Sequence, residues 1–237
     1  MSKAFPSIPQ TNPNAGVAIV RKLGRVMYEP TWHAMRAFTD ERGADTLDEI
    51  WVLEHPPTYT LGMSCRAQPR RSDTDIPVIA TDRGGQITYH GPGQIVIYML
   101  VDLRRSQYGV RQFVSRLEQA VVRLMANFEI VADRREAAPG VYVDGRKIAS
   151  VGLRVRRGAC YHGLSLNVDM DLSPFDDIDP CGYPELRVTQ LADLGVDRSP
   201  HEIAQQLIRE LTTSLDYQRV IEERVFTAPH RHRRLLA

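Results

Sequence analysis

The 237-residue chain has few cysteines, no long apolar run and almost no net charge, and each shortage excludes a class of protein. Its three cysteines, Cys65, Cys160 and Cys181, form neither a C-x-x-C metal motif nor a disulfide framework. The longest stretch without Asp, Glu, Lys or Arg, residues 84–101, includes His90 and a Gly-Pro-Gly turn, so it would not span a bilayer. A formal net charge of +1 gives no excess of positive charge that would attract nucleic acid. We therefore expect neither a membrane, a nucleic-acid nor a metal partner.

The composition that remains, 43% hydrophobic and 25% charged residues, is typical of a globular protein. Residues 1–16 contain three prolines and no apolar signal-peptide region, which predicts a disordered lead-in and a cytoplasmic protein. Residues 229–237 end the chain as a basic tail. Because no linker divides the chain in between, we predict one domain over residues 17–228.

Apolar periodicity predicts a mixture of strands and helices. Strands are indicated near residues 17–28, 49–54, 78–81 and 95–103, and helices near 31–43 and 110–128. Asp144-Gly145 and Arg157-Gly158 are hairpin turn signals, so residues 141–168 should form a three-stranded meander. Ser199 is a predicted N-cap for a last helix to about residue 217. This order predicts an α+β fold with a mixed, mostly antiparallel sheet and flanking helices.

Two side chains of the meander are unusual for an apolar strand. Counting every second residue places Lys147 on the face of Ala149, Val151, Leu153 and Val155, where a desolvated amine could act as a base. Two other readings stay open: Lys147 extends to water from the strand end, or a bulge shifts the register. By the same counting, His162 shares a face with Cys160, Leu164, Leu166 and Val168, as a core histidine would.

Two further segments could carry chemistry. Residues 83–94, R-G-G-Q-I-T-Y-H-G-P-G-Q, have enough glycine for the backbone to approach a ligand, or they form a turn between two strands. Cys181 lies in the loop D-P-C-G-Y-P, where the following glycine leaves room for a substrate. Cys160 fits a strand core and Cys65 an exposed loop, so Cys181 is the best candidate nucleophile.

Three blocks of this sequence resemble the lipoyl(octanoyl) transferase family. They are R-G-G-Q-I-T-Y-H-G-P-G-Q at 83–94, G-R-K-I-A-S-V-G-L-R-V-R-R-G with Y-H-G-L-S-L-N-V within 145–168, and F-D-D-I-D-P-C-G-Y at 175–183. The resemblance implies a fold related to the catalytic domain of biotin and lipoate protein ligases. It also implies transfer of an octanoyl group from octanoyl-acyl carrier protein to a lysine of lipoyl domains, in 2-oxoacid dehydrogenase complexes and the glycine cleavage H protein.

The resemblance also assigns roles to residues of this chain. It implies that Cys181 forms the acyl thioester and that Lys147 activates it. The segments implied to bind the acyl substrate are Arg83, Gly84, Gly85, Gln86, Ile87, Thr88, Tyr89 and His90; Ser150, Val151 and Gly152; and Gly163, Leu164 and Ser165. Ser165 departs from the alanine that we expect more often in the family.

No cofactor is expected, because transfer from a thioester to an amine ends in a more stable amide and needs neither ATP nor a metal. Backbone N–H groups near Gly182 or at Gly84-Gly85 are alternative oxyanion donors. The rival interpretations are an ATP-dependent lipoate ligase, which needs no cysteine, and a non-catalytic acyl-binding module. A papain-like hydrolase is disfavoured, because its cysteine signature is missing.

Overall fold

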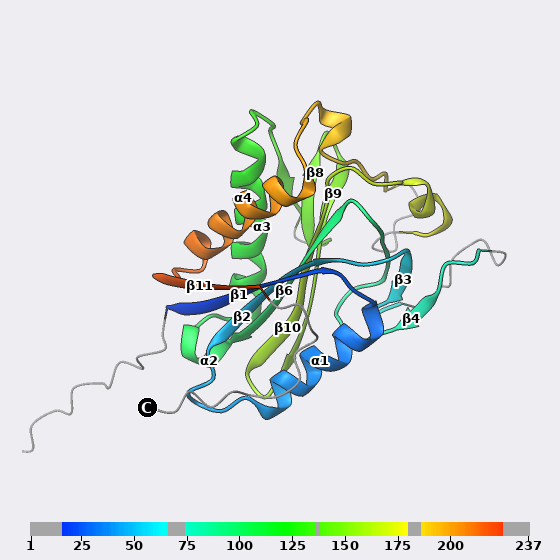
Figure 1. The fold of residues 1–237 in the computed structure, drawn as a ribbon. Helices are drawn as coiled ribbons and strands as arrows, with labels where there is room; N and C mark the ends of the chain where they lie inside the picture. The colour runs from blue at the N-terminus through cyan, green and yellow to red at the C-terminus, as the bar shows by residue number, and fades with distance from the viewer. Residues whose placement is uncertain (1–15, 66–73, 136–137, 180–185, 225–237) are drawn as a thin grey trace, which may run out of the picture.

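The computed structural model describes residues 16–65, 74–135, 138–179 and 186–224, and it is built on a large twisted sheet (Figure 1). Within these residues the strand order is β11-β1-β2-β6-β10-β9-β8-β7. β1 pairs in parallel with β2 and β11, and the pairings from β2 to β7 are antiparallel. The strands are β1 (Val17–Arg25), β2 (Asp48–Glu54), β6 (Gln94–Asp102), β7 (Asp133–Arg134), β8 (Gly140–Val143), β9 (Arg146–Arg156), β10 (Ala159–Asn167) and β11 (Arg219–Arg224). The predicted mixed, mostly antiparallel sheet is confirmed.

A second, three-stranded sheet has the order β4-β3-β5. It consists of β3 (Thr58–Leu61), β4 (Val78–Ala80) and β5 (Ile87–His90), with β3 parallel to β4 and antiparallel to β5. The sequence predicts β4 only. β3 and β5 are four residues long, one after a Pro-Pro pair and one inside the glycine-rich segment, so neither shows a period-2 pattern.

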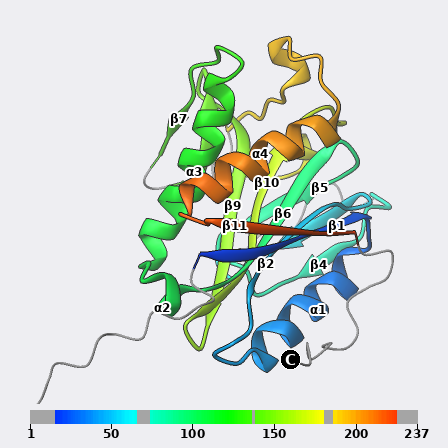
Figure 2. The same ribbon diagram turned by 60° about the vertical axis from the view of Figure 1, so that its left-hand side comes forward.

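Helices cover both faces of the large sheet (Figures 1 and 2). α3 (Val110–Ala126) and α4 (Pro200–Ser214) pack on one face, and α1 (Tyr28–Glu41) packs on the other. Shorter elements are α2 (Leu103–Ser106) and the 3₁₀ turns η1 (Ser173–Asp177) and η3 (Ala192–Leu194). In the described part of the chain, no helix is long and apolar enough to cross a bilayer.

The predicted helix boundaries hold at the N-terminus of α4 and are wrong at its C-terminus. Ser199 forms a capping box with Glu202, as its sequence position indicates. The helix ends at Ser214 and not near residue 217, because the chain turns there to add β11 beside β1. That parallel pairing joins the two ends of the described chain, and a local pattern does not reveal it.

The meander forms as predicted, but a bulge in β9 corrects the face assigned to Lys147. Val141 pairs with Ala149 and Tyr142 with Lys147, which leaves Ile148 without a partner on β8. Ile148 and Ala149 consequently both pack into the core beneath α3. Lys147 therefore points to the opposite face, together with Ser150, and not to the face of Ala149.

His162 is also on the opposite face from the one predicted. Its backbone is left-handed, with φ of 61°, in the middle of β10. Cys160 and Leu164 pack beneath α3 and α4, whereas adjacent Tyr161 and His162 both donate hydrogen bonds to Asp82 on the α1 side. The left-handed residue breaks the alternation of side chains that the period-2 count assumes.

Gly163 lets β10 lie close against β6, which makes a stability prediction possible. A Cβ at this position would lie 2.0 Å from the carbonyl oxygen of Ile97, in the backbone of the neighbouring strand. Gly163→Ala should therefore lower the free energy of unfolding by about 3 kcal/mol, measured by urea denaturation. Gly43→Ala is the matched control, since a Cβ there meets nothing within 4 Å. Equal stability of the two variants would contradict the close packing.

Candidate active site

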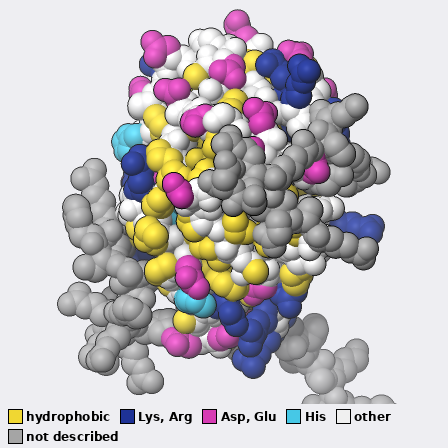
Figure 3. All heavy atoms as spheres, turned by 90° about the vertical axis from the view of Figure 1, so that its right-hand side faces the viewer, with side chains coloured by type: hydrophobic (Ala, Val, Ile, Leu, Met, Phe, Trp, Pro, Cys, Tyr) yellow, Lys and Arg dark blue, Asp and Glu magenta, His cyan; other side chains and the backbone are white. Residues whose placement is uncertain are grey.

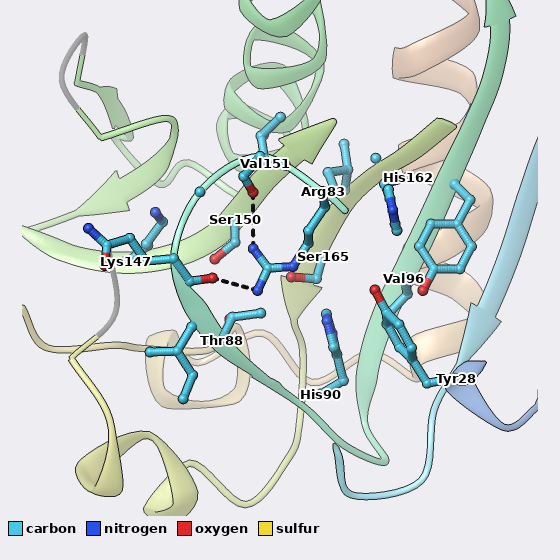
Figure 4. Close-up of a pocket in the computed structure, with 18 residues that line it drawn as sticks. Tyr28, Arg83, Thr88, His90, Val96, Lys147, Ser150, Val151, His162 and Ser165 are labelled. Atoms are coloured by element: carbon cyan, nitrogen blue, oxygen red, sulfur yellow. Dashed lines mark hydrogen bonds between the residues drawn. The ribbon is translucent and has the colours of Figure 1, made fainter. Parts of the chain in front are cut away.

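A pocket lies where β5 and the glycine-rich loop before it pass over β9 and β10 (Figure 4). The cavity itself has a volume of about 60 Å³ and opens to solvent. The residues that line it are Tyr28, Arg83, Gly84, Gly85, Gln86, Ile87, Thr88, His90, Val96, Tyr98, Lys147, Ser150, Val151, Gly152, His162, Gly163, Leu164 and Ser165. Segments far apart in sequence, including residues 83–90, 147–152 and 162–165, thus meet in one cavity.

The pocket contains most of the residues singled out from the sequence. Of the implied substrate segments, Tyr89 alone is not among the lining residues; it packs against Tyr59 and Phe175. Cys181 lies outside the described residues. The sequence analysis missed Tyr28, Val96 and Tyr98 as lining residues, and their apolar context gave no signal to find them.

Lys147 is buried at one end of the pocket, with 2% of its surface exposed. Its Nζ donates to the carbonyl oxygen of Pro139 at 2.9 Å and lies 5.4 Å from the ring centroid of Tyr142. Gly140 leaves the room for this side chain, since a Cβ there would be 2.5 Å from the lysine Cε. The amine is therefore held in a fixed place and does not extend to solvent.

Glu118 of α3 fixes the backbone beside this lysine. Its Oε1 accepts the N–H of Gly140 at 2.8 Å. Burial raises the pKa of the Glu118 carboxyl, and the Gly140 hydrogen bond and the nearby charges of Arg134 and Lys147 oppose that rise. α3 thereby positions the segment that holds Nζ.

Arg83 holds the glycine-rich loop over the sheet. Its guanidinium donates to the carbonyl oxygens of Gly84 and Gln86, at 3.1 and 2.6 Å, and to the carbonyl oxygen and hydroxyl of Thr60. The N–H of Gly84 donates to the carbonyl oxygen of Leu153 at 2.8 Å. Because that N–H already has a partner, Gly84 is a poor oxyanion donor, which weakens one of the two alternatives from the sequence.

Asp82 organises the other end of the pocket. Its Oδ1 accepts hydrogen bonds from Trp32 Nε1 at 2.7 Å and His162 Nε2 at 2.9 Å, and its Oδ2 accepts one from the Tyr161 hydroxyl. Burial would raise the pKa of Asp82, but these three donors outweigh it and hold the pKa well below its usual range. Asp82 is therefore ionised, and His162 carries its hydrogen on Nε2.

A hydrogen-bonded aromatic cluster borders the same end. His55 donates from Nδ1 to the Val26 carbonyl oxygen and accepts the Tyr98 hydroxyl at Nε2, both at 2.7 Å. His90 donates from Nδ1 to Gln94 Oε1 at 2.7 Å. Burial lowers the pKa of His55 to about 4 and that of His90 to about 3. Both imidazoles are therefore neutral near pH 7.

These two histidines predict how stability depends on pH. The pKa of each is near 6.5 in the unfolded chain and about 4 and 3 in the folded one, so below pH ~6.5 only the unfolded chain binds the protons. Stability should fall by about 2–3 kcal/mol between pH 7 and pH 5.5, measured by urea denaturation at both pH values. His55→Asn keeps a donor for Val26 and should make this dependence shallower. Equal wild-type stability at both pH values would contradict the prediction.

The two described cysteines do not line the pocket. Cys160 is completely buried, and burial raises the pKa of its thiol to about 12, which makes it an inert core residue as expected. Cys65 was expected to be exposed but is partly buried, because it packs against the cluster that contains Tyr59 and Phe175. Among the described residues, no group of three or more His, Cys, Asp or Glu could hold a metal ion.

The face on the side of β3 and β4 combines apolar and cationic side chains (Figure 3). Hydrophobic side chains gather in its middle, and both Lys or Arg and Asp or Glu side chains lie around them. Met63, after β3, and Val78, at the start of β4, are large exposed apolar residues. The guanidinium of Arg154 lies 2.9 Å from the sulfur of Met63.

Sequence comparisons place the chain beside known acyl-transferring proteins. Residues 27–212 match the family model of the lipoyl protein ligase A/B catalytic domain. An octanoyltransferase of Thiobacillus denitrificans is 57% identical over 217 residues, which cover 91% of this chain and 97% of that protein. An octanoyltransferase of Alkalilimnicola ehrlichii is 61% identical over 183 residues, covering 77% and 85%.

Solved structures confirm the expected fold. Lipoate-protein ligase A bound with ATP superposes with a TM-score of 0.71 at 17% identity, covering 88% of this chain and 89% of that one. Biotin protein ligase from Aquifex aeolicus, in complex with biotin and ATP, has a TM-score of 0.55 at 13% identity, covering 84% and 70%. At these identities the likeness concerns the fold alone.

Proposed function

The chain belongs to the lipoyl protein ligase A/B catalytic-domain family, and we propose that it is an octanoyltransferase that moves the octanoyl group of octanoyl-acyl carrier protein to a lysine of lipoyl domains. Relatives of that name, more than half identical over most of the chain, support octanoyl transfer. The proposal adds three points to octanoyl transfer: the identity of the donor, the acceptor lysine and the thioester intermediate.

One observation carries the assignment of the site. The pocket brings a buried lysine together with the three segments that the sequence resemblance assigned to acyl binding. Without the bulge at Ile148, Lys147 would point into the core beneath α3. A lysine whose amine faces a ligand pocket, with its place fixed by Pro139 and Tyr142, is suited to proton transfer.

The reaction has two steps that share this lysine. The Cys181 thiol loses its proton to Lys147, and the thiolate attacks the octanoyl thioester, forming the octanoyl-enzyme and releasing the carrier thiolate, which Lys147 protonates. In the second step Lys147 accepts a proton from the incoming lysine amine as that amine attacks the octanoyl-enzyme. An amide forms, and the Cys181 thiol is regenerated. No nucleotide enters either step.

The exposed face around Met63 suits the proposed donor. Acyl carrier proteins are acidic, and the part of this surface around Met63 offers exposed apolar side chains and the guanidinium of Arg154. Such a surface complements an acidic, amphipathic partner. We propose it as the side from which the carrier docks.

The related fold of ATP-bound ligases makes adenylate chemistry the second candidate. A ligase activates a free acid with ATP, whereas the proposed enzyme starts from a thioester. A non-catalytic acyl-binding module would bind the group without any covalent adduct. The transferase, the ligase and the binding module therefore differ in whether a covalent acyl-enzyme adduct forms in the absence of ATP.

The test is intact mass spectrometry of the full chain mixed with octanoyl-acyl carrier protein, without ATP or magnesium. We expect the protein mass to rise by one octanoyl group while free carrier thiol appears in a burst. The isolated adduct should then octanoylate a lipoyl domain in the same buffer, giving ping-pong kinetics. A requirement for ATP would favour the ligase, and binding without an adduct would favour the module.

A further inference from the structure

The His162 side chain has one nitrogen with no hydrogen-bond partner. Its ring is 1% exposed, and Nε2 donates to Asp82. Nδ1 is buried and has no hydrogen-bond partner. Among the described residues that line the pocket, no other buried side-chain nitrogen or oxygen lacks a partner. Because Nε2 carries the hydrogen, Nδ1 presents a lone pair that can only accept. Buried acceptors without a partner are rare in native proteins and need an explanation.

The backbone at His162 gives a second, independent indication of function. A left-handed non-glycine residue inside a strand is strained, and such residues cluster at ligand sites. Here the strained residue turns an imidazole from the core side to the pocket side. Three donors on Asp82, from Trp32, Tyr161 and His162 itself, then lock the ring in place. Burial lowers the pKa of His162, Asp82 opposes this effect, and the nearby cations Arg83 and Arg154 add to it.

The strand register gives the position of His162 relative to the reacting end. His162 pairs with Leu153, six residues beyond Lys147 on β9, and Ser165 pairs with Ser150 between them. With one bulged residue, this separation is about 16–20 Å between Cα atoms, at about 3.3 Å per residue. Figure 4 shows the same order, with Lys147 at one side, Ser150 and Ser165 between, and His162 at the other.

The Cα separation exceeds the length of the proposed substrate, and the side chains at its two ends take up the remainder. An extended octanoyl group measures about 9 Å from carbonyl carbon to methyl, with C–C bonds of about 1.5 Å. The lysine side chain lies at one end of the pocket, and the imidazole lies at the other. With the acyl carbonyl near Lys147, as the proposed function requires, the methyl end of the chain reaches His162.

We propose that His162, oriented by Asp82, is the specificity-determining end of the acyl pocket: it limits the chain length, and its Nδ1 accepts a hydrogen bond from acyl groups that carry a terminal hydroxyl or thiol. This inference rests on the proposed octanoyl transfer and names the acyl class that the same site takes. Asp82 acts as a positioning residue, since its hydrogen bond to Nε2 leaves Nδ1 as the nitrogen without a partner.

The test compares acyl-carrier thioesters by kcat/KM for adduct formation. 8-Hydroxyoctanoyl, 7-methoxyheptanoyl and nonanoyl groups have the same number of heavy atoms, and only the first has a terminal donor. The wild-type enzyme should prefer 8-hydroxyoctanoyl over 7-methoxyheptanoyl by about tenfold, the effect of pairing one buried acceptor. Equal kcat/KM values for these two groups with the wild-type enzyme would contradict the proposed hydrogen bond to His162.

Variants at His162 test the chain-length limit. His162→Gly suits the left-handed backbone and opens the end of the pocket, so the decanoyl-to-octanoyl ratio should rise about tenfold and the hydroxyl preference should disappear. His162→Asn also tolerates this backbone and should raise the ratio less. Asp82→Asn, which cannot accept from all three donors, should weaken the hydroxyl preference and keep the length limit. Exposed His201→Ala is the control and should change neither ratio.

The outcomes separate this inference from the proposed function. If wild-type protein forms no adduct with octanoyl-acyl carrier protein, the proposed function itself fails. If octanoyl transfer proceeds and His162→Gly leaves both ratios at wild-type values, the role of His162 is overturned. A uniform loss of rate across the whole acyl series would also overturn it, because His162 would then act in the chemical step.

Discussion

Cys181→Ala should lower kcat/KM for octanoyl transfer by about a thousandfold or more and leave the fold intact. The reason is chemical, since alanine cannot form the thioester on which both steps of the proposed reaction depend. The measurement is octanoyl transfer to a lipoyl domain, together with urea denaturation to show that the variant is folded. No octanoyl adduct should appear on the variant in the mass spectrum.

The other two cysteines supply the controls for this experiment. Cys160→Ala and Cys65→Ala should retain most activity, because Cys160 lies in the core and Cys65 packs against the Tyr59 cluster, away from the pocket lining. Burial, which raises the pKa of the Cys160 thiol to about 12, also prevents it from replacing Cys181 as the nucleophile. Turnover of Cys181→Ala within tenfold of wild type would show that covalent catalysis at this residue is wrong.

Lys147→Arg should slow the formation of the octanoyl adduct about as much as Lys147→Ala, on the order of a hundredfold. A guanidinium keeps the positive charge, but it does not give up its proton near neutral pH, so it cannot accept the proton of the Cys181 thiol. The measurement is the rate of adduct formation in a single turnover. Full activity of the Arg variant would mean that the residue supplies only electrostatic stabilisation of a thiolate.

The packing around Lys147 requires a second variant in that experiment. The space beside Gly140 is tight, so a bulkier arginine could disturb β8 as well as remove the base. Lys147→Met has nearly the shape of lysine and no amine, and it should be as inactive as Lys147→Ala while unfolding at a urea concentration close to that of wild type. If Lys147→Met is active, Lys147 is not the base in the acylation step.

Local sequence determined most of the framework of this protein. The turns at Asp144-Gly145 and Arg157-Gly158 adopt the positive φ values that the hairpin signals predict. The capping box of Ser199 begins α4, and the apolar period of α3 predicts its buried face. These features depend on residues a few positions apart, so a pattern is enough to find them.

The tertiary structure decided which side chains meet in the pocket. A period of two assigns Lys147 and His162 to the core face, and a bulge and a left-handed residue reverse both assignments. Asp82, which orients His162, comes from a loop eighty residues earlier in the chain. Strands β3, β5 and β11 form only because distant segments pair with them. Such features are stabilised by contacts between residues far apart in sequence, and no local pattern encodes them.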